Sequence, residues 1–148
     1  MSMWTAFTEI DKAVAKLGFS NREFSELSPE LSQEVLTVIK EKFLGGKDPF
    51  FWWEHYRDAE SWHPQLQGFE LLQEICPDRE VYLIPQGEDE ERVYISSPTV
   101  IAKVLGECAA FEYTIAGQAY DWLITETHQD TVIAVGERAK LRLRSASS

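Results

Sequence analysis

The sequence has few cysteines and lacks long hydrophobic runs. Cys76 and Cys108 are the only cysteines among 148 residues. A chain of this length buries about two-thirds of its unfolded surface, so its core needs no disulfide or metal, and we expect reduced thiols. No apolar run approaches the roughly 20 residues that span a bilayer, and no basic segment with an apolar stretch behind it marks an export signal. The sequence therefore predicts a cytoplasmic protein that does not enter a membrane.

Basic residues are also scarce. There are 14 Lys and Arg against 25 Asp and Glu, which gives a formal net charge of −11 at pH 7. Affinity for nucleic acids comes largely from Lys and Arg that neutralise phosphates, and anionic membrane surfaces attract basic segments in the same way. The charge balance argues against both partners. It favours a basic protein partner, whose approach an acidic surface accelerates.

Hydrophobic residues make up 44% and charged residues 26% of the chain, as is ordinary for a globular domain. We expect one domain over residues 1–144 and a disordered tail at 145–148. Apolar spacing and capping signals predict helices in the first half. They are expected at 2–17, at 20–27 as a short turn, from Pro29 to the glycines at 45 and 46, and at 64–75. The residues expected to be buried in the helix from Pro29 are Leu31, Val35, Val38, Ile39 and Phe43.

β-branched and aromatic residues predict strands in the second half. These strands are expected at 81–84, 93–95, 111–115, 120–125 and 131–135, with a helix beginning at Pro98. The alternating segment 140–144 predicts a further edge strand with its leucines inward. Its basic residues Lys140, Arg142 and Arg144 would then discourage strand addition or dock an acidic groove. The order of elements predicts an α+β domain, with N-terminal helices packed on a mostly antiparallel sheet of about five to six strands and one inserted helix.

The most unusual segment is rich in aromatic residues and contains three of the five tryptophans. Its candidate binding residues are Trp52, Trp53, His55, Tyr56, Arg57, Trp62 and His63. One interpretation is a satellite core where the helical half meets the sheet. A second is a partly exposed binding surface, because Trp, Tyr and Arg dominate interface hot spots. A third is a small-molecule pocket whose polar groups are His55, Arg57 and His63.

The turn between the first two strands carries four consecutive acids, Glu88, Asp89, Glu90 and Glu91. A turn with this composition often faces solvent and has no binding role. As a functional feature, it is a compact negative patch beside a sheet, which raises the rate of encounter with a basic partner at low salt.

Signals for metal binding and catalysis are missing. His55 and His63 do not have the four-residue spacing of two ligands on one helical face, and neither cysteine lies in a paired motif. Glu126, His128 and Asp130 alternate, but they fall where a hairpin turn is expected. The chain has no Gly-x-Ser-x-Gly elbow and no complete phosphate loop. We therefore expect no metal, no cofactor and no enzymatic activity.

Three segments of the second half carry a resemblance: Phe111–Ile115, Tyr120–His128 and Val132–Gly136. Together they resemble a family of small, uncharacterised bacterial proteins with an aromatic strand, a Trp-Leu-Ile strand that ends in Glu-x-His, and a last strand that ends in Gly. The resemblance implies that Glu126 and His128 are secondary candidate residues. More broadly, an acidic α+β domain of this size is similar to SUKH-type immunity proteins, which protect bacteria from toxins.

The sequence supports two functional hypotheses. The first is a non-enzymatic, acidic protein-binding domain, such as an immunity or antitoxin-like inhibitor, that uses the Trp52–Trp53 segment and the acidic turn to bind a basic partner. The second is a small-ligand-binding protein or unrecognised enzyme with a pocket around His55–His63. A structural module without a dedicated site is the remaining alternative.

Overall fold

The computed structural model describes residues 5–64 and 67–147. The described chain contains five α-helices, two 3₁₀ helices and one seven-stranded sheet. Its helices are α1 (Ala6–Leu17), α2 (Pro29–Phe43), η1 (Trp52–His55), η2 (Gly68–Leu71), α3 (Leu72–Ile75), α4 (Pro98–Gly106) and α5 (Glu137–Ser147). Its strands are β1 (Phe24–Glu26), β2 (Glu60–Trp62), β3 (Val81–Pro85), β4 (Tyr94–Ser96), β5 (Tyr113–Gly117), β6 (Leu123–Glu126) and β7 (Val132–Val135).

The sheet has the order β1-β4-β3-β5-β6-β7-β2, and each neighbouring pair is antiparallel. The predicted α+β class is confirmed, as are the five strands expected between residues 81 and 135. The sheet is larger than the predicted five to six strands because β1 and β2 add one strand at each edge. Each has only three residues, too few to show a two-residue period.

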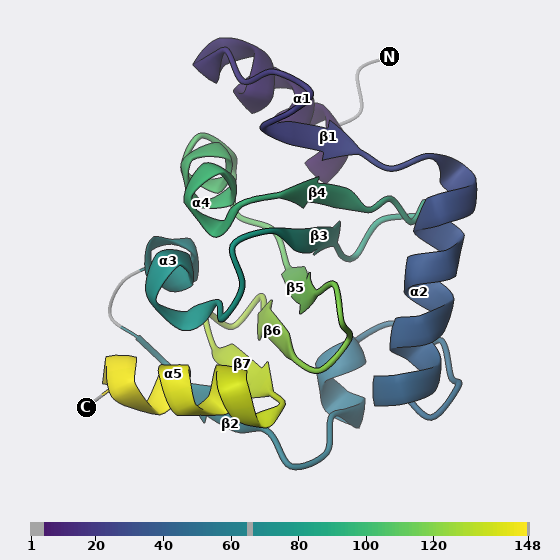
Figure 1. Cartoon of the computed structure of the whole chain (residues 1–148), viewed down its shortest axis with the longest axis vertical. Coiled ribbons are helices and arrows are strands. Elements are labelled where there is room, and N and C mark those ends of the chain that lie inside the picture. The colour runs from purple at the N-terminus through teal and green to yellow at the C-terminus, as the bar shows by residue number, and fades with distance from the viewer. Residues whose placement is uncertain (1–4, 65–66, 148) are drawn as a thin grey trace.

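Both faces of the sheet are covered. Helices α1, α3, α4 and α5 pack on one face, and α2 and η1 pack on the other (Figure 1). The side chains of β3 alternate accordingly, since Leu83 belongs to the first core and Ile84 to the second. Strand β5 lies in the middle and is buried along its whole length. Its start, together with the end of β6, positions the site described below.

Local capping signals place several helix ends. Ser28 caps α2 and accepts the N–H of Leu31, with Pro29 in the first turn, as predicted. Gly18 ends α1 in the left-handed conformation that glycine adopts easily. The cap of α1 is Thr5, whereas the predicted cap, Ser2, lies outside the described residues.

The buried face of α2 differs from the prediction. Leu31 is 49% exposed and Val38 is also exposed, while Ser32 and Leu36 are buried. The buried stripe therefore runs through residues 32, 35, 36 and 39, rotated by about one position from the expected stripe.

Two other predicted helices are wrong or shorter than expected. The side chain of Glu23 accepts the backbone N–H of Ser20, as in a capping box, but the chain then pairs with β4 as strand β1. The helix predicted at 64–75 is reduced to η2 and α3, and its residues 65 and 66 lie outside the described chain.

The edge strand predicted at 140–144 is wrong, because this segment belongs to α5. Leu143 is buried but Leu141 is 56% exposed, so the two leucines do not share an inward face. Lys140 is buried as well, and its ammonium group contacts Glu137 and Asp58 instead of forming a basic strip. Lys, Leu, Arg and Ala are all strong helix formers, and this propensity prevails over the alternating pattern. The helix also takes in residues 145–147, which lie in the expected tail.

Candidate functional site

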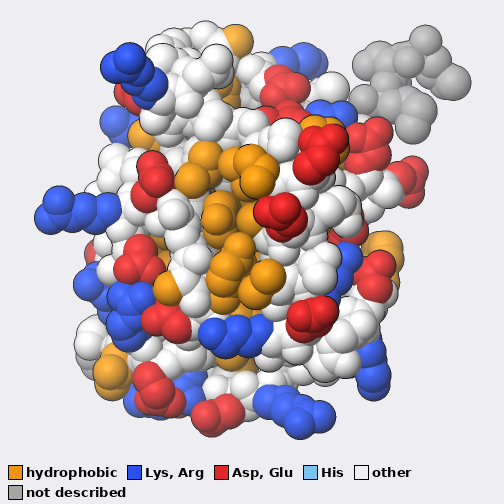
Figure 2. Space-filling view, turned by 45° about the vertical axis from the view of Figure 1, so that its right-hand side comes forward, with side chains coloured by type: hydrophobic (Ala, Val, Ile, Leu, Met, Phe, Trp, Pro, Cys, Tyr) orange, Lys and Arg blue, Asp and Glu red, His pale blue; other side chains and the backbone are white. Residues whose placement is uncertain are grey.

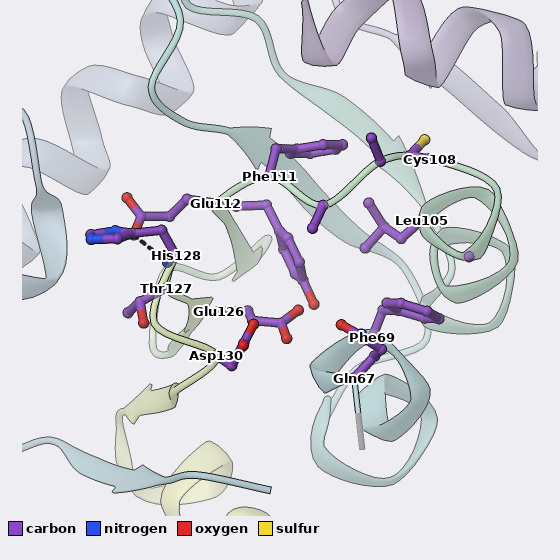
Figure 3. Close-up of a pocket in the computed structure, with 14 residues that line it drawn as sticks. Gln67, Phe69, Leu105, Cys108, Phe111, Glu112, Glu126, Thr127, His128 and Asp130 are labelled. Atoms are coloured by element: carbon purple, nitrogen blue, oxygen red, sulfur yellow. Dashed lines mark hydrogen bonds and ion pairs between the residues drawn. The ribbon is translucent and has the colours of Figure 1, made fainter. Parts of the chain in front are cut away.

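A cleft of about 330 Å³ opens at one end of the sheet, where β5 begins and β6 ends. Its other walls come from η2, the end of α4 and the segment that leads into β5. Figure 3 shows Glu126 and Asp130 close together near the middle of the view, Glu112 beside His128 on the left, and Leu105, Cys108 and Phe69 on the right. The 14 described residues that line the cleft include three carboxylates and no Lys or Arg. The cleft is therefore acidic on one side and apolar on the other.

Glu126 is held at the floor of the cleft by the backbone of η2. It is only 8% exposed, and its Oε2 accepts the N–H of Gly68 at 2.7 Å. A Cβ atom at residue 68 would lie 2.5 Å from the Glu126 carboxyl carbon, so only glycine permits this approach. The close contact fixes the position of the carboxylate.

Tyr113 is the cross-strand partner of Glu126 and also lines the cleft. Its side chain is buried, and its hydroxyl lies beside the carboxylate of Glu126 without a hydrogen bond of good geometry to any described residue. Burial raises the pKa of this phenol well above its usual value, and the nearby charge of Glu126 adds to the effect. The hydroxyl is therefore neutral and able to donate or accept a hydrogen bond.

Glu112 connects the cleft to the aromatic segment. Its Oε1 accepts the indole N–H of Trp53 at 2.9 Å and the backbone N–H of His128 at 3.1 Å. The imidazole Nδ1 of His128 lies 3.2 Å from the same oxygen. Glu112 is 8% exposed, so this carboxylate acts as a buried acceptor between η1 and the β6–β7 turn.

Aromatic rings surround this carboxylate. The ring of His128 packs against Phe51 at 5.1 Å and against Trp53 at 6.1 Å, measured between centroids. Phe50 packs edge-on against Phe51 and is 69% exposed. We refer to Phe50, Phe51, Trp53 and His128 as the aromatic cluster. Trp53 and His128 are among the candidates expected from the sequence, whereas Glu112 is not. Its signal in the sequence is a charged residue inside the mostly apolar segment 111–115.

The sheet separates the other aromatic candidates. Trp52 is buried in the core under α2, and the hydroxyl of Tyr56 lies 2.7 Å from Thr125 Oγ1 on the same face. Burial raises the pKa of Tyr56 to about 12. Trp62 packs against the core on the opposite face. The aromatic segment is thus divided between two cores, with only part of it beside the cleft.

The polar candidates in this segment also lie apart. His55 and Arg57 are exposed and line a hollow near the C-terminal end of α2, together with Lys42. His63 is exposed just after β2. None of the three lines the cleft.

The acidic turn is largely engaged inside the molecule. Glu88 accepts the N–H of Ala6 at the start of α1, at 2.6 Å. Glu91 pairs with Lys40 of α2 at 2.9 Å, and Glu90 pairs with Arg92 at 3.0 Å. These contacts join the turn to α1 and α2, and they neutralise part of its charge.

A family model covers nearly the whole chain, matching residues 3–147. Its description is a family of unknown function, DUF6756. The chain belongs to this family. The match confirms the expected membership of an uncharacterised domain family. No curated protein and no solved structure matches the chain.

Cys108 supplies a thiol to the lining of the cleft. Burial, together with the charges of Glu9 and Glu107, raises the pKa of Cys108 to about 11. The Cys108 thiol is therefore protonated at neutral pH and is a poor nucleophile. Figure 3 places Cys108 and His128 at opposite ends of the cleft, so they do not form a Cys-His pair.

Two further properties concern metals and membranes. Within residues 5–64 and 67–147, no group of three or more His, Cys, Asp or Glu side chains is arranged to hold a metal ion. No helix in the described part of the chain is both long and apolar enough to cross a membrane.

Proposed function

We propose that this protein is a non-enzymatic domain that binds a basic protein partner through the cleft and the adjoining aromatic cluster. The observation that carries the proposal is the composition of the cleft, which has three carboxylates and no Lys or Arg among its lining residues. A cavity with this charge attracts cationic groups and repels anionic ones.

The aromatic cluster supplies a second element of a binding surface. Phe50 is the most exposed of the large hydrophobic side chains in the described chain. Exposed aromatic residues beside a polar rim are typical of interface hot spots. Glu112 links this cluster directly to the cleft, so that one partner can contact both.

The rest of the surface is less specific. Figure 2 shows a face on which a stripe of hydrophobic side chains is bordered by both acidic and basic residues. The acidic turn offers Asp89 as an exposed carboxylate, while its three other acids are engaged as described. The cleft is therefore a better candidate for the main contact than the turn.

The more specific form of the proposal is a bacterial, cytoplasmic, immunity-like inhibitor of a basic toxin. The net charge of −11 supports it, because an acidic inhibitor associates rapidly with a basic target. The second sequence hypothesis, a pocket around His55–His63, receives no comparable support, since neither histidine lines the cleft.

The test is capture of a partner by the tagged protein from a lysate of its host, at about 50 mM and about 500 mM salt. We expect one stoichiometric basic protein that is retained at low salt and lost at high salt. Phe50→Ala should weaken its binding, whereas Leu141→Ala removes a similarly exposed hydrophobic side chain from α5 and should not. A partner whose binding is independent of salt would contradict the electrostatic part of the proposal.

A further inference from the structure

The hydroxyl of Tyr113 is an unsatisfied polar group in the wall of the cleft. The residue is 3% exposed, and its hydroxyl lies beside the Glu126 carboxylate but makes no hydrogen bond of good geometry with any described residue. Most buried side-chain polar atoms have a hydrogen-bond partner, because an unpaired one loses the water contacts of the unfolded chain. A group from outside the protein would satisfy this hydroxyl when it occupies the cleft.

The surroundings of Tyr113 indicate the chemistry of that group. Glu126 is its cross-strand neighbour, and Asp130 also lines the cleft. Glu112 adds negative charge nearby, although its carboxylate already accepts hydrogen bonds from Trp53 and His128. Carboxylates accept hydrogen bonds and attract positive charge. We therefore expect the occupant to carry a positive charge and to donate hydrogen bonds. An anionic occupant is disfavoured, because the lining residues include no Lys or Arg.

The apolar side of the cleft indicates which cationic group fits it best. Phe69 and Phe111 contribute aromatic rings, and Phe111 meets Tyr113 edge-on at a centroid distance of 6.3 Å. A guanidinium group is planar, stacks on aromatic faces and carries five N–H donors, which suits several acceptors spread along one wall. An ammonium group is compact and strongly hydrated, and it uses such a wall less well.

We propose that the cleft receives the guanidinium group of an arginine side chain of the partner. This inference rests on the proposed function. The guanidinium donates to Glu126 and to the oxygen of Tyr113, and its plane lies against the aromatic side of the cleft. Gly68 holds Glu126 in place for this contact.

The direct test is a titration of the full chain with N-acetylarginine amide, followed by ¹H–¹⁵N NMR. We expect shifts of the amide signals of Gly68, Tyr113 and Glu126. N-acetylcitrulline amide is the matched control, because it has nearly the same shape without the charge. Equal shifts with citrulline, or shifts that map to other residues, would overturn the inference. An equal response to N-acetyllysine amide would overturn the assignment to a guanidinium.

Two variants test the contacts. Tyr113→Phe should weaken binding of arginine amide about fivefold, since it removes one hydrogen bond. Glu126→Gln should weaken it by roughly 10-fold to 100-fold, since it removes a charged acceptor but can still accept the N–H of Gly68. Tyr94→Phe and Glu34→Gln make the same chemical changes outside the cleft and should leave binding unchanged. If each cleft variant binds as well as its control, the inference is wrong.

The same variants separate this inference from the proposed function. A partner that is still captured at low salt by both Tyr113→Phe and Glu126→Gln would overturn the arginine site but leave the protein-binding proposal intact. Specific binding of arginine amide by a protein that captures no partner at either salt concentration would support the site and contradict the proposed function.

Discussion

The carboxylate of Glu126 accepts the backbone N–H of Gly68 at 2.7 Å, although the two residues are 58 positions apart in the chain. This bond fastens η2 to the end of β6 and forms the floor of the cleft. The carboxylate can approach the backbone this closely because residue 68 is a glycine and has no side chain. One contact therefore links the packing of the fold to the proposed binding site.

The first prediction concerns this contact. Gly68→Ala places a methyl group 2.5 Å from the Glu126 carboxyl carbon, so the carboxylate must move and its bond must break. We expect the free energy of unfolding to fall by about 1–3 kcal/mol, as for other overpacked sites, measured by urea denaturation. Gly106→Ala is the control, because its methyl group would lie 3.4 Å from the Phe69 ring, an ordinary contact. Equal stability of the two variants would show that the close approach at residue 68 is not required.

The second prediction concerns the unpaired hydroxyls. Tyr113→Phe should increase the free energy of unfolding by about 1 kcal/mol, because it removes a buried polar group that lacks a partner. Tyr94→Phe should have a smaller effect, because the Tyr94 hydroxyl also interacts with Arg92. If the arginine site is correct, only Tyr113→Phe also weakens binding. A loss of stability in either variant, measured by urea denaturation, would mean that its hydroxyl is already paired in the free protein.

The third prediction concerns the carboxylate beneath the aromatic cluster. Glu112→Ala leaves the indole N–H of Trp53 and the backbone N–H of His128 without their acceptor. We expect a loss of about 1–2 kcal/mol in the free energy of unfolding, because the two part-buried donors lose a charged acceptor but can be partly rehydrated. Glu112→Gln retains an acceptor and should lose less. Glu90→Ala removes an exposed carboxylate of a surface ion pair and should change stability by under about 1 kcal/mol.

The fourth prediction concerns alkaline pH. The pKa of Tyr56 is raised to about 12, chiefly by burial, whereas the unfolded chain should ionise near the ordinary value of 10.0. Between these two pH values the unfolded state holds fewer protons than the folded state, so stability falls as the pH rises. We expect the stabilisation to be complete below about pH 10 and to disappear as the pH passes about 12.

This prediction is checked by urea denaturation at a series of alkaline pH values. Tyr56→Phe removes the titrating group and should make the decline with pH shallower than in the wild type. Since it also removes the hydrogen bond to Thr125, the comparison is of slopes and not of absolute stabilities. An unchanged slope would show that Tyr56 does not contribute to the alkaline loss.

Much of the fold follows from local sequence. The Ser28-Pro29 start of α2, the glycine at the end of α1 and the five strands between residues 81 and 135 all agree with their sequence patterns. These features depend on a few adjacent residues, through capping, left-handed backbone conformations and the fit of β-branched side chains to a pleated sheet. Such preferences do not require contacts with distant residues.

Other elements depend on contacts that the local pattern does not contain. Strand β1 exists because residues 24–26 pair with β4, and β2 exists because residues 60–62 pair with β7. The segment from Lys140 alternates like a strand, yet it is helical because its residues favour helix and Leu143 packs into the core. In each case contacts with distant residues accompany the conformation that the segment adopts.

The candidate site also combines features that the local sequence indicates with contacts that only the folded chain forms. The sequence singled out Trp53, Glu126 and His128 by residue type, but it assigned Trp53 to a different site from the other two. Only the tertiary structure joins Trp53 to His128 through Glu112, and Glu126 to the backbone of Gly68. Residue types indicated which side chains could bind a cation or a ring, and local capping signals placed the start of α2 and the end of α1. The register of the strands decided which of those side chains meet, because contacts between residues 58 or 59 positions apart depend on every element between them.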